Sequence, residues 1–338
     1  MRRIVITDYP GVLHRDLEYE KNKILAALKD TEVEVVPFEN REQWIHAVGN
    51  ADALLTAFLP INDAVMEAVP KLRCIVLNAS GYDNVDLAAA SRRHIAVIPI
   101  EEYCTEEVAE HTMALILALS RGLKHYGKEI DEQYRWQYTS LQGLHRLKGQ
   151  TLGIAGFGKI GRMVGKLADA FGMRILVYSP TGKTINKEAY PVQFVPAEEL
   201  FEKSDIITNH MAIGKEHYHF FNEEAFRKMK RHPLFINVGR GAAVEEAALL
   251  KALQNGWIRG AGLDVLESEM PELGKTGLTG REQVILTPHS AFYSEESLRA
   301  LQDISCDNLI YFFKGEWNRI HYICLLYTSD AADDTPCV

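Results

Sequence analysis

Short apolar runs alternate with amphipathic stretches along almost the whole chain, and this alternation restricts the possible folds more than any other feature. It extends from residues 3–7 to residues 95–98, then begins again at residue 151 and continues to residues 284–286. Strands separated by helices pack as a parallel sheet with helices on both faces. Because 338 residues exceed what one hydrophobic core usually organises, we predict an α/β fold with two doubly wound parallel-sheet domains.

The second alternation lies within the first. A long amphipathic stretch at residues 295–313 follows the second set of strands, and it is long enough to return to the first domain. We therefore predict one domain built from residues 1–101 and 292–323, with a second domain, residues 102–291, inserted into it.

Residues 324–338 have neither strand nor helix periodicity, and they resemble the translation of a sequencing adapter. We exclude them from the predicted fold, as an expression tag would be excluded. The native chain beyond about residue 323 is then not given by this sequence. A genuine disordered tail is the alternative.

The composition excludes several classes of protein. With 47% hydrophobic and 25% charged residues, the chain is neither disordered nor collagen-like. The formal charge is −9 and no basic block is present, so we predict no nucleic-acid and no membrane partner. No apolar run reaches the roughly 18 residues of a membrane span, and no signal-peptide pattern opens the chain. Five scattered cysteines predict a cytoplasmic protein with reduced thiols and no metal site.

A glycine-rich turn follows the first strand of the second domain and opens a helix, with glycine at 156, 158 and 161. In a dinucleotide site, Gly156 would permit the tight turn, Gly158 the approach of the pyrophosphate, and Gly161 close helix–strand packing. The helix N-terminus would offer N–H groups to the phosphates. A turn that serves packing alone and a methyltransferase-type adenosyl site are the alternatives.

The acidic residue that usually binds the ribose of NAD is absent from the end of the next strand, where Ser179 stands instead. A missing carboxylate removes repulsion against a 2′-phosphate, and Thr181, Lys183 and Thr184 follow closely. The sequence therefore permits NADP and does not exclude NAD.

Three polar residues follow three successive strands: Arg240, Glu269 and His289. Open α/β sheets bind ligands beyond the carboxyl ends of their strands. A guanidinium binds carboxylates, an imidazole transfers protons, and a carboxylate beside the imidazole orients it. The set suits the reduction of a 2-oxo acid. Taken singly, each residue has a simpler interpretation as an ion-pair partner or solvated side chain, and Asp264 either caps a turn or contacts the cofactor.

Several motifs in order resemble the D-isomer-specific 2-hydroxyacid dehydrogenase family, within the formate/glycerate dehydrogenase group, and most closely the branch of the C-terminal-binding-protein corepressors. The resemblance covers about residues 1–320 and implies a Rossmann NAD(P)-binding domain inserted into a flavodoxin-like substrate-binding domain. The matching segments, besides the glycine turn, are Ser80-Gly81-Tyr82-Asp83-Asn84-Val85-Asp86, Val108-Ala109-Glu110-His111, Asn237-Val238-Gly239-Arg240-Gly241, Gly262-Leu263-Asp264-Val265 and Thr287-Pro288-His289.

The resemblance also implies roles for single residues. Arg240 binds substrate, Glu269 supports the base, and His289 is the acid/base. Ser80 and Gly81 offer backbone N–H groups to the substrate carboxylate, and Tyr103 touches substrate in some members. The implied cofactor-binding residues beyond the three glycines are Lys159, Ile160, Ser179, Met211, Val238, Gly239 and Asp264.

The sequence thus predicts an oxidoreductase that transfers a hydride between NAD(P)H and a small 2-oxo acid or D-2-hydroxy acid, which the sequence does not name further. The alternative is a nucleotide-sensing interaction protein, like the corepressors, in which turnover is incidental. The resemblance implies a homodimer. Residues 108–123, expected to form one long helix, and the irregular aromatic segment 131–147 are its candidate interface.

Overall fold

The chain forms two compact units, Met1–Tyr103 with Ser294–Val338, and Cys104–Tyr293. The computed structural model describes residues 1–179, 182, 188–212, 215–320 and 323, so the segment 324–338 lies outside it. The predicted domain boundaries, after residues 101 and 291, each lie two residues before the boundaries between these units. Among the described helices, none combines the length and apolar character that crossing a bilayer requires.

Unit 1 contains a five-stranded sheet in the order β2-β1-β3-β4-β5, and every pair in it is parallel. This is the flavodoxin-like strand order. The strands are β1 (Arg2–Ile6), β2 (Thr31–Val35), β3 (Ala53–Thr56), β4 (Cys74–Leu77) and β5 (Ala96–Ile98). The helices are α1 (Leu17–Ala27), α2 (Arg41–Val48), α3 (Asp63–Ala68), α4 (Leu87–Arg92) and α11 (Glu295–Lys314).

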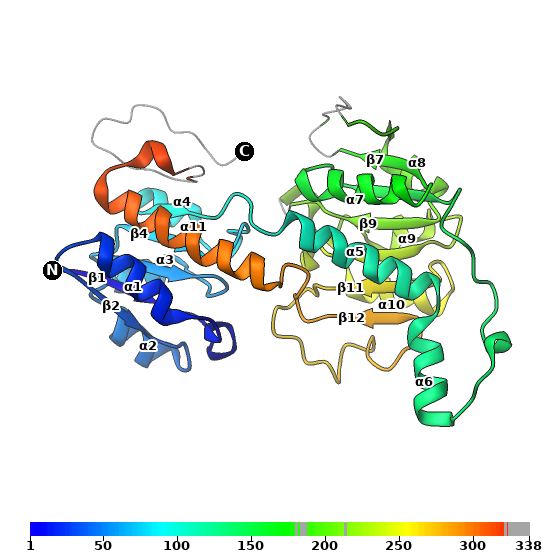
Figure 1. Cartoon of the computed structure of the whole chain (residues 1–338), viewed down its shortest axis with the longest axis horizontal. Coiled ribbons are helices and arrows are strands. Elements are labelled where there is room, and N and C mark those ends of the chain that lie inside the picture. The colour runs from blue at the N-terminus through cyan, green and yellow to red at the C-terminus, as the bar shows by residue number, and fades with distance from the viewer. Residues whose placement is uncertain (180–181, 183–187, 213–214, 321–322, 324–338) are drawn as a thin grey trace. The chain divides into compact units, whose positions relative to one another are not determined.

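Helix α11 returns to unit 1 after the whole of unit 2 and lies alongside α1 (Figure 1). A hydrogen bond to a buried ion pair helps to join the two helices. Glu20 on α1 has a fully buried side chain and accepts hydrogen bonds from Arg15 Nε at 2.7 Å and from Gln302 Nε2, on α11, at 3.0 Å. Apolar residues of both helices complete the contact with one face of the sheet.

Replacing Glu20 by alanine is expected to lower the free energy of unfolding of unit 1 by about 3–5 kcal/mol, because it leaves the buried Arg15 guanidinium without its partner. Urea denaturation followed by circular dichroism measures the change. Glu18→Ala is the control, since its pair with Lys21 is exposed and should contribute less than about 1 kcal/mol. Equal losses in both variants would contradict the assignment.

Unit 2 contains a seven-stranded, all-parallel sheet in the order β12-β11-β10-β9-β6-β7-β8. Six of these strands follow the Rossmann order, and the topological switch point lies between β6 and β9. The strands are β6 (Thr151–Ala155), β7 (Arg174–Tyr178), β8 (Gln193–Phe194), β9 (Ile206–Asn209), β10 (Leu234–Asn237), β11 (Gly260–Leu263) and β12 (Val284–Leu286). The helices are α5 (Thr105–Ser120), α6 (Leu123–Gln133), α7 (Lys159–Ala170), α8 (Ala197–Lys203), α9 (Glu223–Arg227) and α10 (Glu246–Gln254). The predicted class, two parallel-sheet α/β domains, is confirmed.

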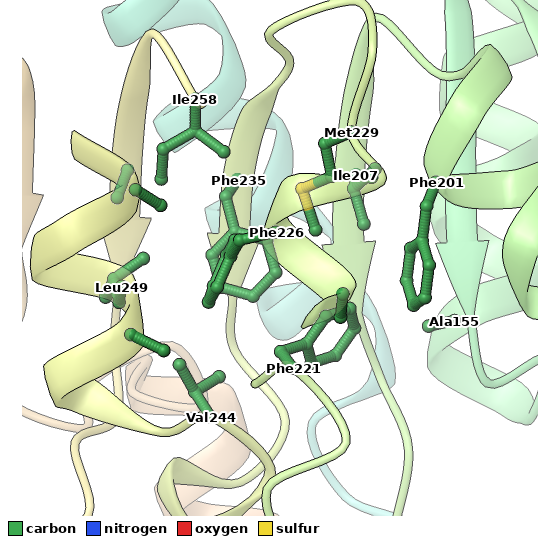
Figure 2. Close-up of a cluster of buried hydrophobic side chains, with 14 of the residues drawn as sticks. Ala155, Phe201, Ile207, Phe221, Phe226, Met229, Phe235, Val244, Leu249 and Ile258 are labelled. Carbon is green, nitrogen blue, oxygen red and sulfur yellow. The ribbon is translucent and has the colours of Figure 1, made fainter. Parts of the chain in front are cut away.

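Aromatic side chains form the centre of one core of unit 2 (Figure 2). Phe221 and Phe226 meet Phe235 of β10 edge-on, with ring centroids 4.9 and 5.3 Å apart. Leu249 of α10 packs against the same cluster. This rigid layer supports β9 and β10, whose carboxyl ends carry parts of the candidate site.

The single helix predicted at residues 108–123 is wrong. Helix α5 ends at Ser120 and α6 begins at Leu123, so the segment 131–147 also starts within a helix. Gly122 between them has φ +62°, and a Cβ there would lie 2.2 Å from Leu141 Cδ2. A left-handed residue cannot continue a helix, which explains the break.

Candidate active site

Gly156 makes the turn at the switch point of the unit 2 sheet. Its φ is +89°, and a Cβ would lie 2.7 Å from Met211 N and 2.8 Å from His210 O, after β9. The position therefore excludes every other residue type on two grounds, backbone conformation and close approach. The turn after β6 and the loop after β9 are thus in direct contact, as a nucleotide site at this point requires.

The other two glycines of the turn differ in their surroundings. A Cβ at Gly161, in the first turn of α7, would lie 2.3 Å from Gly156 O, so this glycine permits close packing. A Cβ at Gly158 would meet nothing within 4 Å. Gly158 is the N-cap of α7 and no side chain caps the helix. Open space in front of a helix N-terminus fits a pyrophosphate, which backbone N–H groups and the helix dipole attract.

Gly158→Ala is expected to weaken binding of NADH by at least about tenfold, or about 1.4 kcal/mol, because the methyl group would occupy the space available to the pyrophosphate. The thermal midpoint should stay near that of the wild type, since φ −77° is open to alanine. Energy transfer from tryptophan to bound NADH measures affinity. The matched control is Gly127→Ala on α6, where a Cβ also meets nothing within 4 Å. An unchanged affinity of Gly158→Ala for NADH would show that the pyrophosphate does not bind at this turn.

Ser179 follows β7 directly, at the position where an acid would contact the ribose. The preceding residue, Tyr178, stacks on Phe220 with ring centroids 5.2 Å apart. Thr181, Lys183 and Thr184, the candidate phosphate ligands, lie outside the described residues. The preference between NAD and NADP therefore stays open.

A pair of buried amides joins the loops after β9 and β10. Asn209 donates to the side-chain oxygen of Asn237 at 3.0 Å, and its own oxygen accepts from Met211 N at 3.1 Å. Asn237 in turn donates to Arg240 O and accepts from Gly239 N. The pair places Met211 and Gly239 at one edge of the sheet. Sequence reasoning missed this role, because a strand-end asparagine carries no pattern of its own.

His210 lies between this pair and the glycine turn. Burial lowers the pKa of its imidazole to about 3, so the ring is neutral at physiological pH. Its Nε2 lies 2.9 Å from Thr208 Oγ1. His210 therefore adds no positive charge to the site, whereas the N-terminus of α7 attracts phosphate.

Arg240 follows β10 and opens a short 3₁₀ turn, Gly241–Ala243. One guanidinium nitrogen donates to Gly239 O at 3.0 Å. The turn packs so closely against the loop after β11 that a Cβ at Gly241 would lie 1.7 Å from Leu266 O. Arg240 is thus held at the carboxyl edge, next to the segment that leads to Glu269.

Asp264 fixes the turn that carries His289. Its buried carboxylate accepts hydrogen bonds from Thr287 Oγ1, Ser290 N and Ala291 N at 2.5–2.9 Å, and its carbonyl accepts from His289 N at 2.8 Å. His289 has φ +51°, an uncommon conformation that these bonds stabilise. Of the two predicted roles for Asp264, the structure shows the cap. A contact with the cofactor stays a prediction.

His289 and Glu269 form a direct pair. Nδ1 of His289 lies 2.7 Å from Oε2 of Glu269, and the two side chains are 29% and 49% exposed. The contact fixes the orientation of the imidazole ring. Because β10, β11 and β12 are neighbours, Arg240, Glu269 and His289 follow adjacent strands. His111 of α5 approaches the same turn, with Nε2 3.0 Å from Thr287 Oγ1.

The remaining predicted substrate residues belong to unit 1. Ser80 and Gly81 follow β4, and Tyr103 is the last residue of the first segment of the unit. Asn84, in the same loop, donates to Ala57 O and Leu59 O and so connects this loop with the one after β3. The participation of Ser80, Gly81 and Tyr103 stays a prediction.

A family model described as the NAD binding domain of D-isomer specific 2-hydroxyacid dehydrogenases matches residues 113–291. Together with the strand order and the glycine turn, this match defines the protein as a nicotinamide-dependent oxidoreductase. The chain is 39% identical over 276 residues to glyoxylate reductase of Korarchaeum cryptofilum, covering 80% of this chain and 82% of that protein. The chain belongs to the D-isomer-specific 2-hydroxyacid dehydrogenase family.

Solved structures agree in fold over almost the whole chain. D-lactate dehydrogenase from Aquifex aeolicus, complexed with NAD and lactic acid, matches with a TM-score of 0.82 and 27% identity, over 94% of this chain and 97% of that one. An acyclic imino acid reductase (Bsp5) in complex with NADPH and D-Arg matches with a TM-score of 0.83 and 26% identity, over 96% and 100% of the two chains.

Proposed function

We propose that this protein reduces a small 2-oxo acid to the D-2-hydroxy acid with NADH or NADPH, and that glyoxylate is its first candidate substrate. The observation that carries the proposal is the Glu269–His289 pair at 2.7 Å, whose residues follow β11 and β12, next to β10, which precedes Arg240. The glyoxylate reductase relative supports the choice of substrate.

Each residue of the set has one task in this proposal. Arg240 donates paired hydrogen bonds to the substrate carboxylate and fixes the position of the neighbouring carbonyl. His289 donates a proton from Nε2 to the carbonyl oxygen as it becomes an alkoxide, and accepts that proton in the reverse reaction. Glu269 keeps the ring oriented through Nδ1. The bound reduced nicotinamide supplies the hydride.

The cofactor preference is part of the proposal. Ser179 removes the carboxylate that would repel a 2′-phosphate, which supports use of NADP alongside NAD. The two similar structures carry NAD and NADPH respectively. We propose that the enzyme accepts both cofactors.

A homodimer is proposed through the segment after α6. The side chains of Tyr134, Trp136 and Tyr138 are 87–91% exposed, and large exposed aromatic groups favour protein interfaces. The same surface favours the second candidate function, a nucleotide-sensing interaction protein with incidental turnover. We also propose a cytoplasmic location, which the buried free thiols of Cys74, Cys104 and Cys306 support.

A panel of 2-oxo acids assayed separately with NADH and NADPH tests the function. Glyoxylate, hydroxypyruvate, pyruvate and a bulkier 2-oxo acid would each be mixed with the purified protein, and cofactor oxidation followed by absorbance. We expect glyoxylate or its nearest homologues to give the highest kcat/KM. Tight binding of either cofactor with no turnover of any member would favour the interaction protein.

A further inference from the structure

His219 contacts two of the three loops of unit 2 that carry candidate catalytic residues. Its backbone N–H donates to Ala242 O at 2.9 Å, two residues after Arg240. Its Nε2 is buried and lies 2.8 Å from Oε1 of Glu267, two residues before Glu269, in a close contact that does not have the geometry of a hydrogen bond. One residue of the loop after β9 therefore joins the loops after β10 and β11.

Glu267 is held at its backbone as well as its side chain. Its N–H donates to Glu246 Oε1 at 2.7 Å, and its Oε1 also accepts from Glu246 N at 3.3 Å. Beside it, Leu266 O lies against Gly241, where no side chain fits. The chain just before Glu269 is thus fixed, whereas the Glu269 side chain itself is 49% exposed. The position of Glu269 depends on this loop, because no core surrounds its carboxylate.

The backbone conformation of His219 indicates that the surrounding contacts fix this residue in place. Its φ is +51°, in the left-handed region that few side chains adopt. Such conformations persist where surrounding contacts stabilise them, and they cluster at functional sites. The ring of His219 also stacks on Tyr218, with centroids 4.0 Å apart and planes 20° apart. Ring, backbone and carboxylate contacts together determine where the imidazole lies.

We propose that His219 is a positioning residue of this enzyme: through Glu267 and Ala242 it sets the spacing between the Arg240 loop and the Glu269–His289 pair. This inference rests on the proposed reduction of a 2-oxo acid. His219 itself transfers no proton to substrate. Its contact with Glu267 connects the two loops, and the loss of this contact frees the segment that presents Glu269 to His289.

His219→Asn tests the proposal, because asparagine tolerates the left-handed backbone and is too short to reach Glu267. We expect kcat/KM for the best 2-oxo acid to fall about 10- to 100-fold, as for other residues that orient site groups indirectly. The Kd of NADH should change less than twofold, since the glycine turn is untouched. His232→Asn is the matched control: His232 has φ +49° and lies before β10, at the opposite edge of the sheet.

A double-mutant cycle with Glu267→Ala separates this role from general destabilisation. If both residues act through one contact, the double variant should be little worse than either single variant. Glu267→Gln, which keeps the size of the side chain, should lose less activity than Glu267→Ala, and it replaces His219→Asn if that variant does not fold.

The outcomes distinguish this inference from the proposed function. An active wild type with an equally active His219→Asn, or additive losses in the cycle, would overturn the positioning role alone. A wild type that reduces no 2-oxo acid would overturn the proposed function and this role with it. A parallel loss of NADH affinity would assign His219 to the cofactor site instead.

Discussion

His289→Asn is expected to lower kcat for the best 2-oxo acid by about 10²- to 10⁴-fold, the usual contribution of a positioned acid/base. Asparagine is the preferred replacement because His289 has φ +51°, where alanine would add backbone strain. The four hydrogen bonds that Asp264 accepts from the turn do not involve the imidazole, so the turn should persist. Affinity for NADH should stay within about twofold. Stopped-flow absorbance with saturating cofactor measures the loss.

His232→Asn again serves as the control for this variant, because it makes the same exchange at the same backbone conformation away from the site. Glu269→Gln should give a smaller loss than His289→Asn, since the amide can still orient the ring through Nδ1 but carries no charge. If His289→Asn kept full turnover, another group would have to supply the proton.

Arg240→Met is expected to lower kcat/KM for 2-oxo acids by about 10²- to 10⁴-fold, with a large increase in KM. The guanidinium would make two charged hydrogen bonds to the substrate, each contributing about 1.5–3 kcal/mol. Arg240→Lys should recover only part of the loss, because an ammonium keeps the charge but lacks the planar pair of donors. Initial rates over a wide range of glyoxylate concentration separate KM from kcat.

Arg227→Met is the control for this pair of variants, since Arg227 makes an exposed pair with Glu223 on α9 and should not affect KM. A KM for glyoxylate that is unchanged in Arg240→Met would show that the carboxylate is bound elsewhere. The loop at Ser80 and Gly81 would then be the next candidate.

Much of the fold follows from the sequence because its signals are local. Strands β4 and β12 begin and end where their apolar runs do. The break between α5 and α6 was hidden, since apolar residues continue at helical spacing past Gly122, and only the contact with Leu141 shows why the chain turns there. Periodicity predicts which face of a helix is buried. It does not show that Leu141, 19 positions further along the chain, leaves no room for a side chain at residue 122.

The candidate site could likewise be predicted only in part. Arg240, Glu269 and His289 could be found because each follows a strand, and adjacent parallel strands end at one edge. The residues that hold them were not visible, because their partners are distant in sequence. Asn209 meets Asn237 and His219 meets Glu267 only after β9, β10 and β11 have assembled. The sequence alone does not distinguish a solvated polar residue from one that positions a catalytic group.

The most direct test of the account is a single turnover. Protein preloaded with NADH or NADPH would be mixed with excess glyoxylate, and the loss of nicotinamide absorbance followed in the wild type and in His289→Asn. We predict complete oxidation of the bound cofactor in the wild type and a rate constant at least about 100-fold lower in the variant. Equal rate constants in the two proteins would contradict the assignment of the Glu269–His289 pair as the acid–base centre.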